Sequence, residues 1–405
     1  MTVLDGAIGL QLFDEEFIQD PYPLYARMQA HGPVHRIGDS GFHAVCTWDA
    51  VNDVVARPQE FSSNLTATMT YQGGRVGEFA MGELGADIQA LATADDPAHA
   101  AHRKMLVPQL TARRINALQT YIEETADRLW HEGVDGGRIE WMSAMADRLP
   151  MMIVTRLIGV PDVDTDRLMR WGYASTQLVE GLVDENQLTA AGAAISELAG
   201  YIAEQFERAA ADPRDDLLSV LATACAAGEL AETTAMTMMI TLFSAGGEST
   251  ASLIGSAAYI LATRPDIQRQ VRDQRQLMGA FLEEVLRYEP PFRGHYRHVV
   301  DDTTLCGVDL PAGSRLVLLW GAANRDPRHF DDPHEFRLDR PGGKSHIAFG
   351  KGAHFCVGAA LARLEARILI TELLCRTTHI RARGVGRWLP SLLARRLEHL
   401  ELTLA

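Results

Sequence analysis

The longest apolar stretch of the chain covers residues 233–263 and contains a single charged residue, Glu248. A stretch that is apolar on all faces predicts a buried helix, and an acid at its middle argues against a membrane span. Because burying an unpaired carboxylate is costly, Glu248 is expected to be neutral, paired or open to water, as groups in functional sites often are. Gly246 and Gly247 weaken the helix just before it and predict a local widening. The alternative is a core helix whose small residues pack against a neighbour.

A second pattern follows a cysteine near the end of the chain. Leu361, Leu364 and Ile368 recur at helical spacing, so Cys356 falls at the start of a predicted helix. Free N–H groups and the helix dipole favour an anion there, which is where we expect a thiolate to be kept. The loop before it contains Gly350 and Gly352, which allow tight turns and the close approach of a large flat ligand.

Strand patterns are confined to two places, residues 34–48 and residues 298–320. Turn residues interrupt each of them, at 39–41 and at 311–313 respectively. The chain shows no repeat, low-complexity tract or long linker. We therefore expect one domain over residues 1–405, mainly α, in which a large helical unit is flanked by small β-sheets.

Composition narrows the choice of partners and compartment. The 405 residues include 38 Lys and Arg against 53 Asp and Glu, a net charge of -15, which argues against nucleic acid or an anionic membrane as partner. The N-terminus carries neither a signal peptide nor an anchor pattern. An odd number of cysteines without framework spacing suits a reducing compartment, so we expect a cytoplasmic protein. The cysteines are Cys46, Cys225, Cys306, Cys356 and Cys375.

The loop that ends at Gly358 reads FGKGAHFCVG from Phe349 onward. It resembles the haem-ligand loop of the cytochrome P-450 family, F-G-x-G-x-H-x-C-x-G, at every position of that pattern. The resemblance implies that Cys356 binds the iron of haem b and that Phe349, His354 and Gly358 surround the cofactor. Three alternatives are a buried structural cysteine, a zinc site and a phosphate loop. No C-x-x-C pair exists for zinc, and Leu338 stands where a phosphate loop needs its first glycine.

The apolar stretch carries a second resemblance to this family. Residues 245–250, AGGEST, resemble the oxygen-binding signature A-G-x-[DE]-T-T. The resemblance implies that Ala245 and Gly246 lie against the haem and that Glu248, Ser249 and Thr250 relay protons. Ser249 departs from the pattern because it stands where the family has threonine. Serine keeps the hydroxyl but lacks the methyl group that restricts χ1, so its donor is less firmly aimed.

Cationic residues for the haem propionates come from separate segments. His99 and Arg103 are spaced i and i+4 after a proline, so both can reach one anion from the same helix face, although a solvated helix start has the same pattern. The segment resembles the family's propionate-binding helix, D-P-x-H-x-x-x-R. By the same resemblance, Arg297 and His354 complete the set of charge-assisted donors.

Glu284 and Arg287 form an E-x-x-R pair at helical spacing, which taken alone is usually a weak surface ion pair. The pair matches the E-x-x-R motif of the family, and the segment from Asn324 to Arg340 matches the stretch whose arginine joins it. The resemblance therefore implies that Glu284, Arg287 and Arg340 support the cysteine loop without being catalytic.

Family analogy also implies a substrate pocket. It would be lined by residues 64–81, 171–182 and 241–245, which include Thr241 and Ser244, together with Arg293 and the loop near Leu392. Arg396 stands where the family more often has glycine, so the geometry of that last loop is open.

The resemblance implies a haem-thiolate monooxygenase that hydroxylates a small organic molecule in bacterial secondary metabolism. One alternative is an oxidase that forms C–C or C–N bonds on an aromatic, indole or cyclodipeptide substrate; another is a haem-binding sensor without catalysis. Because no flavin or nicotinamide signature is fused to the chain, a ferredoxin and a ferredoxin reductase are expected as electron donors. Basic residues expected around the sulfur side could steer an acidic donor. They are Lys104, Arg113, Arg114, Lys351, Arg363 and Arg367.

Overall fold

A computed structural model describes residues 4–84, 88–160, 164–177, 182, 185–384 and 386–405. Helices dominate these residues, and α12 (Glu232–Thr263) runs through the middle of the molecule. The helices before α12 are α1 (Leu4–Leu10), α2 (Glu15–Gln19), α3 (Tyr22–His31), α4 (Trp48–Ala56), α5 (Ala98–Leu106), α6 (Ala112–Ala117), α7 (Gln119–Gly133), α8 (Arg148–Ile158), α9 (Thr165–Gln177), α10 (Glu185–Ala211) and α11 (Leu217–Ala226). Those after it are α13 (Pro265–Asp273), α14 (Met278–Tyr288), α15 (Trp320–Ala323) and α16 (Ala359–Cys375).

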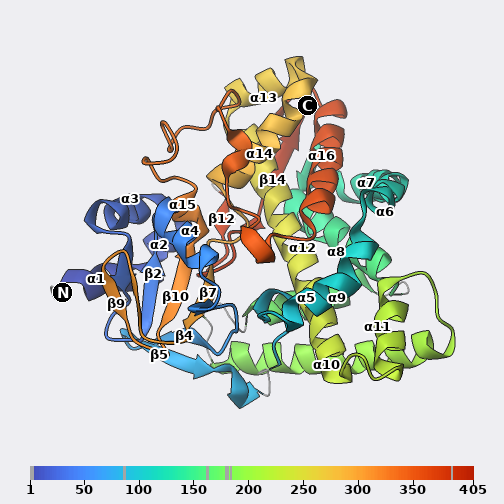
Figure 1. The fold of residues 1–405 in the computed structure, drawn as a ribbon. Helices are drawn as coiled ribbons and strands as arrows, with labels where there is room; N and C mark the ends of the chain where they lie inside the picture. The colour runs from blue at the N-terminus through green and yellow to red at the C-terminus, as the bar shows by residue number, and fades with distance from the viewer. Residues whose placement is uncertain (1–3, 85–87, 161–163, 178–181, 183–184, 385) are drawn as a thin grey trace.

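Most strands lie beside the N-terminal helices, on the left of Figure 1, whereas α7 to α11 lie on the right. In the described residues the largest sheet has the order β1-β2-β10-β7-β3, in which β10 runs parallel to β2 and antiparallel to β7. Its strands are β1 (Val34–Arg36), β2 (Phe42–Val45), β3 (Phe61–Ser62), β7 (Gly294–Val299) and β10 (Arg315–Leu319). Smaller sheets contain β4 (Ala67–Gln72) with β5 (Arg75–Ala80), β8 (Thr303–Leu305) with β9 (Val308–Leu310), β12 (Arg387–Trp388) with β13 (Leu397–His399), and β6 (Arg138–Glu140) with β11 (Ile380–Ala382) and β14 (Glu401–Leu404).

These elements confirm the expected fold class, mainly helical with small flanking sheets. The two predicted strand regions are confirmed as β1–β2 and as β7 to β10. The hairpin of β4 and β5 was not predicted, although Gly73 and Gly74 form its turn with φ of +56° and +77°. Two residues with positive φ are the signature of the commonest tight hairpin turn.

Helix α12 is buried along most of its length because its neighbours cover several of its faces. Its second half packs in one apolar cluster with α8, α14 and α16, and its first half packs in another with α9, α10 and α11. The predicted widening at Gly246 and Gly247 is wrong, since α12 is one unbroken α-helix. The two glycines serve close packing instead: a Cβ on Gly246 would lie 2.8 Å from Val154, and one on Gly247 would lie 2.6 Å from Met151.

The cysteine loop and α16 follow the sequence pattern closely. Leu361, Leu364 and Ile368 face the core from α16, and Cys356 lies three residues before the first residue of that helix. Gly350 and Gly352 both have φ of +69°, a region that residues with a Cβ rarely adopt. The loop thus turns back on itself, and the N–H of Cys356 donates to the carbonyl of Phe349 at 2.9 Å.

No helix among the residues that the structure describes is both long enough and apolar enough to span a bilayer.

Candidate active site

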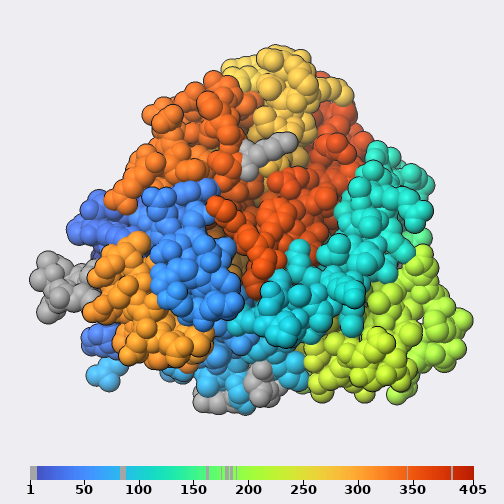
Figure 2. All heavy atoms as spheres, viewed as in Figure 1, coloured from blue at the N-terminus to red at the C-terminus, as the bar shows by residue number. Residues whose placement is uncertain are grey.

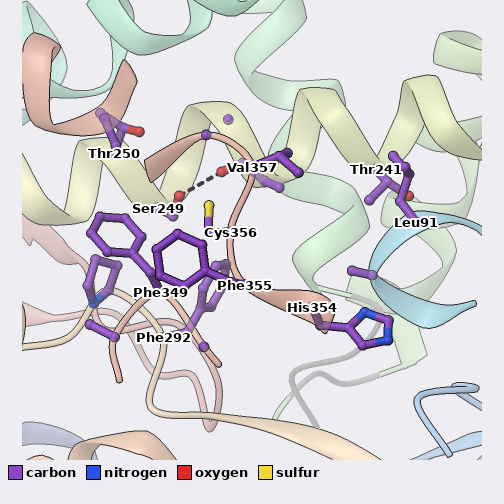
Figure 3. A pocket seen from close by; sticks show the side chains of 18 of the residues that line it. Leu91, Thr241, Ser249, Thr250, Phe292, Phe349, His354, Phe355, Cys356 and Val357 are labelled. Carbon is purple, nitrogen blue, oxygen red and sulfur yellow. Dashed lines mark hydrogen bonds between the residues drawn. The ribbon is translucent and has the colours of Figure 1, made fainter. Parts of the chain in front are cut away.

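A cavity lies between α12 and the cysteine loop (Figure 3). On one face of the molecule, the red segment that carries the loop lies between the blue N-terminal region and the cyan helices (Figure 2). Most of the site residues expected from the sequence line this cavity, although they come from elements far apart in the chain. They are His99, Arg103, Thr241, Ala245, Gly246, Ser249, Thr250, Arg297, Phe349, His354, Cys356 and Gly358.

The Cys356 sulfur points into the cavity between Ser249 on α12 and the rings of Phe349 and Phe355 (Figure 3). Burial raises the pKa of this thiol, and the N–H groups of Gly358 and Ala359 only partly oppose that effect. The N–H groups at the helix start therefore favour the thiolate, as expected, but do not by themselves lower this pKa below its ordinary value. A bound metal ion would supply the missing stabilisation, because a coordinating thiol is deprotonated by the metal itself.

One end of the cavity carries basic side chains. Arg103 donates to the carbonyl of Phe355 at 3.0 Å, and Arg297 donates to the carbonyl of Tyr296 at 2.7 Å. The His99 and His354 rings stack with their centroids 4.0 Å apart, and His354 Nε2 lies 3.0 Å from the hydroxyl of Ser63. Burial, with His99 and Arg297 adding repulsion, lowers the pKa of His354 to about 4, so this ring offers a neutral hydrogen bond at pH 7.

Three expected residues do not line the cavity. The guanidinium of Arg293 is buried and donates to the carbonyls of Phe17, Ile18 and Ala394, because a buried arginine must find acceptors. Its assignment to the substrate pocket is therefore wrong. The Ser244 hydroxyl donates to the carbonyl of Ile240 on its own helix, at 3.0 Å. The third is Glu248, which lies on another face of α12.

Most of the segments assigned to the wider pocket do not line this cavity in the described residues. None of the lining residues falls within 64–81 or within the described part of 171–182, and residues 178–181 lie outside the described residues. Leu392 packs with the N-terminal helices instead. Of these segments, only 241–245 contributes to the lining. The structure adds other residues to the cavity wall, namely Leu91, Ala92, Leu106, Val154, Leu242, Phe292, His295 and Trp320.

His295 is one lining residue that sequence reasoning missed. The indole N–H of Trp320 donates to its Nδ1 at 2.6 Å, which leaves the ring proton on Nε2. The surrounding protein, together with Arg297, lowers the pKa of His295 to about 4, so the ring is neutral. No sequence signal distinguished this histidine, because its partner Trp320 lies 25 residues away.

Glu365 on α16 is a second missed residue. It lines the cavity, its side chain is buried, and its Oε2 has no hydrogen-bond partner among the described residues. Burial raises the pKa of Glu365 well above its ordinary value and so favours the neutral carboxyl. Like Glu248, it is an acid inside a predicted buried helix, and that pattern was the signal that could have found it.

Glu248 is paired, which is one of the three states expected for it. Its Oε1 lies 3.3 Å from Nε of Arg396, the residue that stands where the family more often has glycine. The two residues are 148 positions apart, so the pair could not be predicted from spacing.

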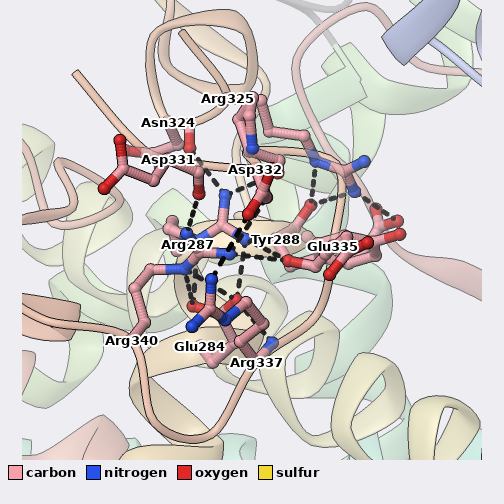
Figure 4. Close-up of polar contacts among 12 residues, drawn as sticks. Glu284, Arg287, Tyr288, Asn324, Arg325, Asp331, Asp332, Glu335, Arg337 and Arg340 are labelled. Atoms are coloured by element: carbon pink, nitrogen blue, oxygen red, sulfur yellow. Dashed lines mark hydrogen bonds and ion pairs between the residues drawn. The ribbon is translucent and has the colours of Figure 1, made fainter. Parts of the chain in front are cut away.

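The expected support pair forms a buried network below the cysteine loop (Figure 4). Glu284 accepts two hydrogen bonds from Arg287, at 2.7 and 2.9 Å, and two from Arg340, at 3.1 and 3.2 Å. Arg287 also donates to the carbonyl of Asn324, whose side chain accepts the N–H of Ile347 at the start of the loop segment. The simple surface ion pair is therefore ruled out, since Glu284 and Arg287 are at most 2% exposed.

The donor set fits a haem. A single soft sulfur in a glycine-rich loop suits one axial position of an iron porphyrin, and two arginines with two histidines at one end suit carboxylates. The wall opposite the sulfur presents the small residues Ala245 and Gly246, which leave room for a flat ligand. Four protein ligands for a closed zinc site are not available around this sulfur in the described residues.

Fold and site together define a haem-thiolate protein. The chain belongs to the cytochrome P450 family of monooxygenases, whose cofactor is haem b. The family's sequence profile matches residues 184–384. Cytochrome P450 144 of Mycobacterium tuberculosis is 65% identical over 391 residues, covering 96% of this chain and 90% of that protein. Cytochrome P450 monooxygenase PikC of Streptomyces venezuelae is 32% identical over 416 residues, covering 99% and 94%. The ligand-free structure of Mycobacterium smegmatis CYP164A2 superposes with a TM-score of 0.88 at 27% identity, covering 98% and 100%.

Proposed function

We propose that the protein hydroxylates a small, largely apolar organic molecule, and that the reaction belongs to bacterial secondary metabolism. The observation that carries the proposal is that the Cys356 sulfur and the hydroxyl-bearing turn of α12 face each other across one cavity. Apolar groups from Leu91, Leu242 and Phe292 support the substrate class. The assignment to secondary metabolism and to the cytoplasm follows the bacterial type of family member that the chain resembles.

In this proposal Cys356 binds the haem iron, and His99, Arg103, Arg297 and His354 bind the propionates. Arg103 and Arg297 contribute charge, and the ring of His354 contributes a hydrogen bond. Ala245, Gly246, Phe349 and Gly358 lie against the porphyrin faces. When bound, the haem supplies the activation of dioxygen, and the protein holds the substrate and moves protons.

Proton supply is assigned to Glu248, Ser249 and Thr250. The Ser249 hydroxyl lines the cavity and donates to the carbonyl of Ala245 at 2.6 Å, so its oxygen is left to accept a hydrogen bond from the cavity side. Thr250 lines the same wall and is 4% exposed. To pass a proton along a chain of water molecules, the Ser249 hydroxyl would turn its hydrogen from this carbonyl toward the cavity and accept another from the Glu248 side.

The Ser249→Ala variant tests this assignment. We expect product formation per electron consumed to fall by about a hundredfold, because a positioned proton donor contributes that much or more. Hydrogen peroxide should account for the missing electrons, and the Ser249→Thr variant should keep or improve the wild-type yield because its methyl group restricts χ1. Equal product yield from the alanine variant would remove Ser249 from the relay.

The substrate is to be found by spectral titration of the ferric protein with a metabolite library, followed by turnover under isotopically labelled dioxygen. One labelled oxygen atom in the product supports hydroxylation. Product without label, joined through a new C–C or C–N bond, supports the coupling alternative. Binding without any turnover across the panel supports the sensor alternative.

We further propose that a ferredoxin, itself reduced by a ferredoxin reductase, delivers the electrons at the face behind the sulfur. Two of the basic residues expected there are already paired, Arg114 with Asp215 and Arg363 with Glu283. The side chains of Lys104 and Arg113 are exposed. The large apolar residues Val107 and Phe355, 47% and 45% exposed, come from the same segments. A basic and apolar surface on an acidic protein suits an acidic partner.

The charge-reversal variant with Lys104→Glu and Arg113→Glu should slow reduction by a ferredoxin by about tenfold or more at low salt, since electrostatic steering raises association rates by at least that factor. The difference should shrink as salt is added. Stopped-flow reduction under carbon monoxide measures it. Arg269→Glu, an exposed arginine on the distant α13, is the matched control and should reduce at the wild-type rate at every salt concentration (Figure 1). A salt-independent rate for the double variant would contradict this docking face.

A further inference from the structure

Helix α12 presents two different faces around the acid–alcohol turn. Ala245, Ser249 and Leu253 recur every four residues and line the cavity. Glu248 and Ser252 recur with the same spacing one position earlier, but they do not line it, and they are 2% and 1% exposed. The carboxylate assigned above to proton supply therefore lies away from the site that it is to serve.

The second face is covered by the loop between β12 and β13, near the end of the chain. The hydroxyl of Ser252 donates to the carbonyl of Arg395. The N–H of Arg395 donates to the carbonyl of Pro291, and the carbonyl of Arg396 accepts the N–H of Leu389, both at 2.8 Å. These three hydrogen bonds fix the backbone of the loop. One of them joins it to Ser252, which is one helical turn after Glu248 on α12.

The side chain of Arg396 contacts two acids. Its Nε lies 3.3 Å from Oε1 of Glu248, and its Nη1 lies 3.3 Å from Oδ1 of Asp147, just before α8. The guanidinium also lies 4.6 Å from the ring centroid of Tyr173, a residue of α9. The Tyr173 hydroxyl donates to the same Asp147 oxygen at 3.2 Å. These four side chains meet on the side of α12 that faces away from the cavity. We call them the Arg396 cluster: Arg396, Glu248, Asp147 and Tyr173.

We propose that Arg396 is a positioning residue for Glu248: it pairs with the side chain and holds it away from the cavity, while Asp147, which shares the guanidinium, sets how firmly it is held. The inference deepens the proposed proton supply and rests on it. Glu248 then acts by leaving Arg396, taking a proton from water and releasing it on the Ser249 side.

The contact between Arg396 and Glu248 is a single, long hydrogen bond. Strong arginine–carboxylate pairs are bidentate with distances of about 2.7–2.9 Å, whereas this one is a single contact at 3.3 Å. Oε2 of Glu248 has no hydrogen-bond partner among the described residues. The guanidinium is shared: Nε contacts Glu248 and Nη1 contacts Asp147, so each acid receives one contact, and a charged Asp147 weakens the hold on Glu248.

Asp147 is the member of the cluster that titrates near neutral pH. Burial raises its pKa to about 6, against the attraction of Arg396 and the Tyr173 hydrogen bond, while the charges of Glu140 and Glu248 add to the increase. Below that pH Asp147 is neutral, and Arg396 has Glu248 as its only charged partner. Above it the Asp147 carboxylate competes for the guanidinium. The release of Glu248 should therefore become easier as pH rises through about 6.

The first test is spectroscopic and needs no substrate. Infrared spectra of the haem-loaded protein are compared at pH 7 for wild type, Arg396→Gln, Arg396→Lys and the Arg396→Gln/Glu248→Gln double variant. We expect Arg396→Gln to gain one protonated-carboxyl band that the double variant lacks, and Arg396→Lys to resemble wild type because it restores the positive charge. Arg387→Gln, an exposed arginine of the same hairpin, is the matched control and should gain no band. The absence of the new band from folded Arg396→Gln overturns the proposal.

The second test follows hydrogen peroxide released per electron consumed, across pH 5 to 8, during turnover of a substrate identified by titration. This ratio does not depend on the rate of electron delivery. In wild type it should fall as pH rises through about 6. Asp147→Asn should remove that pH dependence and keep the ratio at the high, acid-side value, because asparagine cannot compete for Arg396 as a carboxylate does. An unchanged pH dependence in Asp147→Asn overturns the role of Asp147, and this arm does not require Arg396→Gln to fold.

Failure of the proton relay and failure of the Arg396 positioning role give different results. If Glu248→Gln releases no more peroxide than wild type, Glu248 supplies no proton and the proposed relay is wrong, whatever the infrared spectra show. If Glu248→Gln does release more peroxide while Arg396→Gln changes neither the spectrum nor the ratio, the relay stands and the positioning role of Arg396 is wrong.

Discussion

Replacing Glu284 by alanine should lower the free energy of unfolding by about 3–5 kcal/mol, the range found when one partner of a buried ion pair is removed. The loss should be at the upper end, because this carboxylate compensates both Arg287 and Arg340, and both arginines are buried beside it. Denaturant unfolding of the haem-loaded protein measures the change. We also expect faster haem loss, since the network is joined through Asn324 to the segment that carries the cysteine loop.

The matched control is Glu132→Ala, which removes the acid of an exposed glutamate–arginine pair on α7. Its partner Arg128 is 48% exposed, so water can replace the lost contact. The expected change is below about 1 kcal/mol. If Glu284→Ala were no more destabilising than Glu132→Ala, the network would not be the support that its burial indicates.

The second large effect concerns the sulfur itself. Cys356→Ser should abolish product formation, because a serine hydroxyl does not supply the electron-rich thiolate that this family uses to activate dioxygen. Product formation with the electron-transfer partners measures the loss, and haem content per protein shows whether the cofactor is still present. Cys306→Ser is the control, because Cys306 is an exposed cysteine that does not line the cavity. It should retain the wild-type rate, and any substantial turnover by Cys356→Ser would contradict the assignment of the ligand.

Local patterns were sufficient to predict the elements that carry the site. The apolar run around Glu248 predicted α12, and the spacing of Leu361, Leu364 and Ile368 predicted α16 after the cysteine. Both depend on periodicity within one segment, which a single sequence contains. The hairpin of β4 and β5 was also predictable from the pair Gly73 and Gly74 but was overlooked.

What could not be predicted depends on contacts between distant segments. Arg396 completes a pair with Glu248, and Trp320 fixes the tautomer of His295, in each case across a stretch of chain whose path the sequence does not specify. Arg293 was assigned to the pocket although it does not line it. Family position suggested a pocket residue, but three backbone carbonyls from two other segments hold its side chain in the core.

The prediction of which segments line the cavity failed for a related reason. The expected pocket segments 64–81 and 171–182 were chosen by analogy with the family, whereas which residues reach the cavity depends on how loops pack in this chain. The β4–β5 hairpin packs against N-terminal residues, and Phe13 and Tyr71 stack with ring centroids 4.2 Å apart. Leu91, Ala92 and Phe292 are among the residues that form the wall.

The most direct measurement is the absorption spectrum of the purified protein after reduction under carbon monoxide. If the Cys356 thiolate is bound to haem iron, the Soret band of the ferrous carbonyl complex should be strongly red-shifted relative to that of a histidine-bound haem. Cys356→Ser should lose this shifted band while keeping its native circular dichroism. A folded, haem-loaded wild-type protein without the shifted band, or a Cys356→Ser variant that retained it, would contradict sulfur ligation at residue 356.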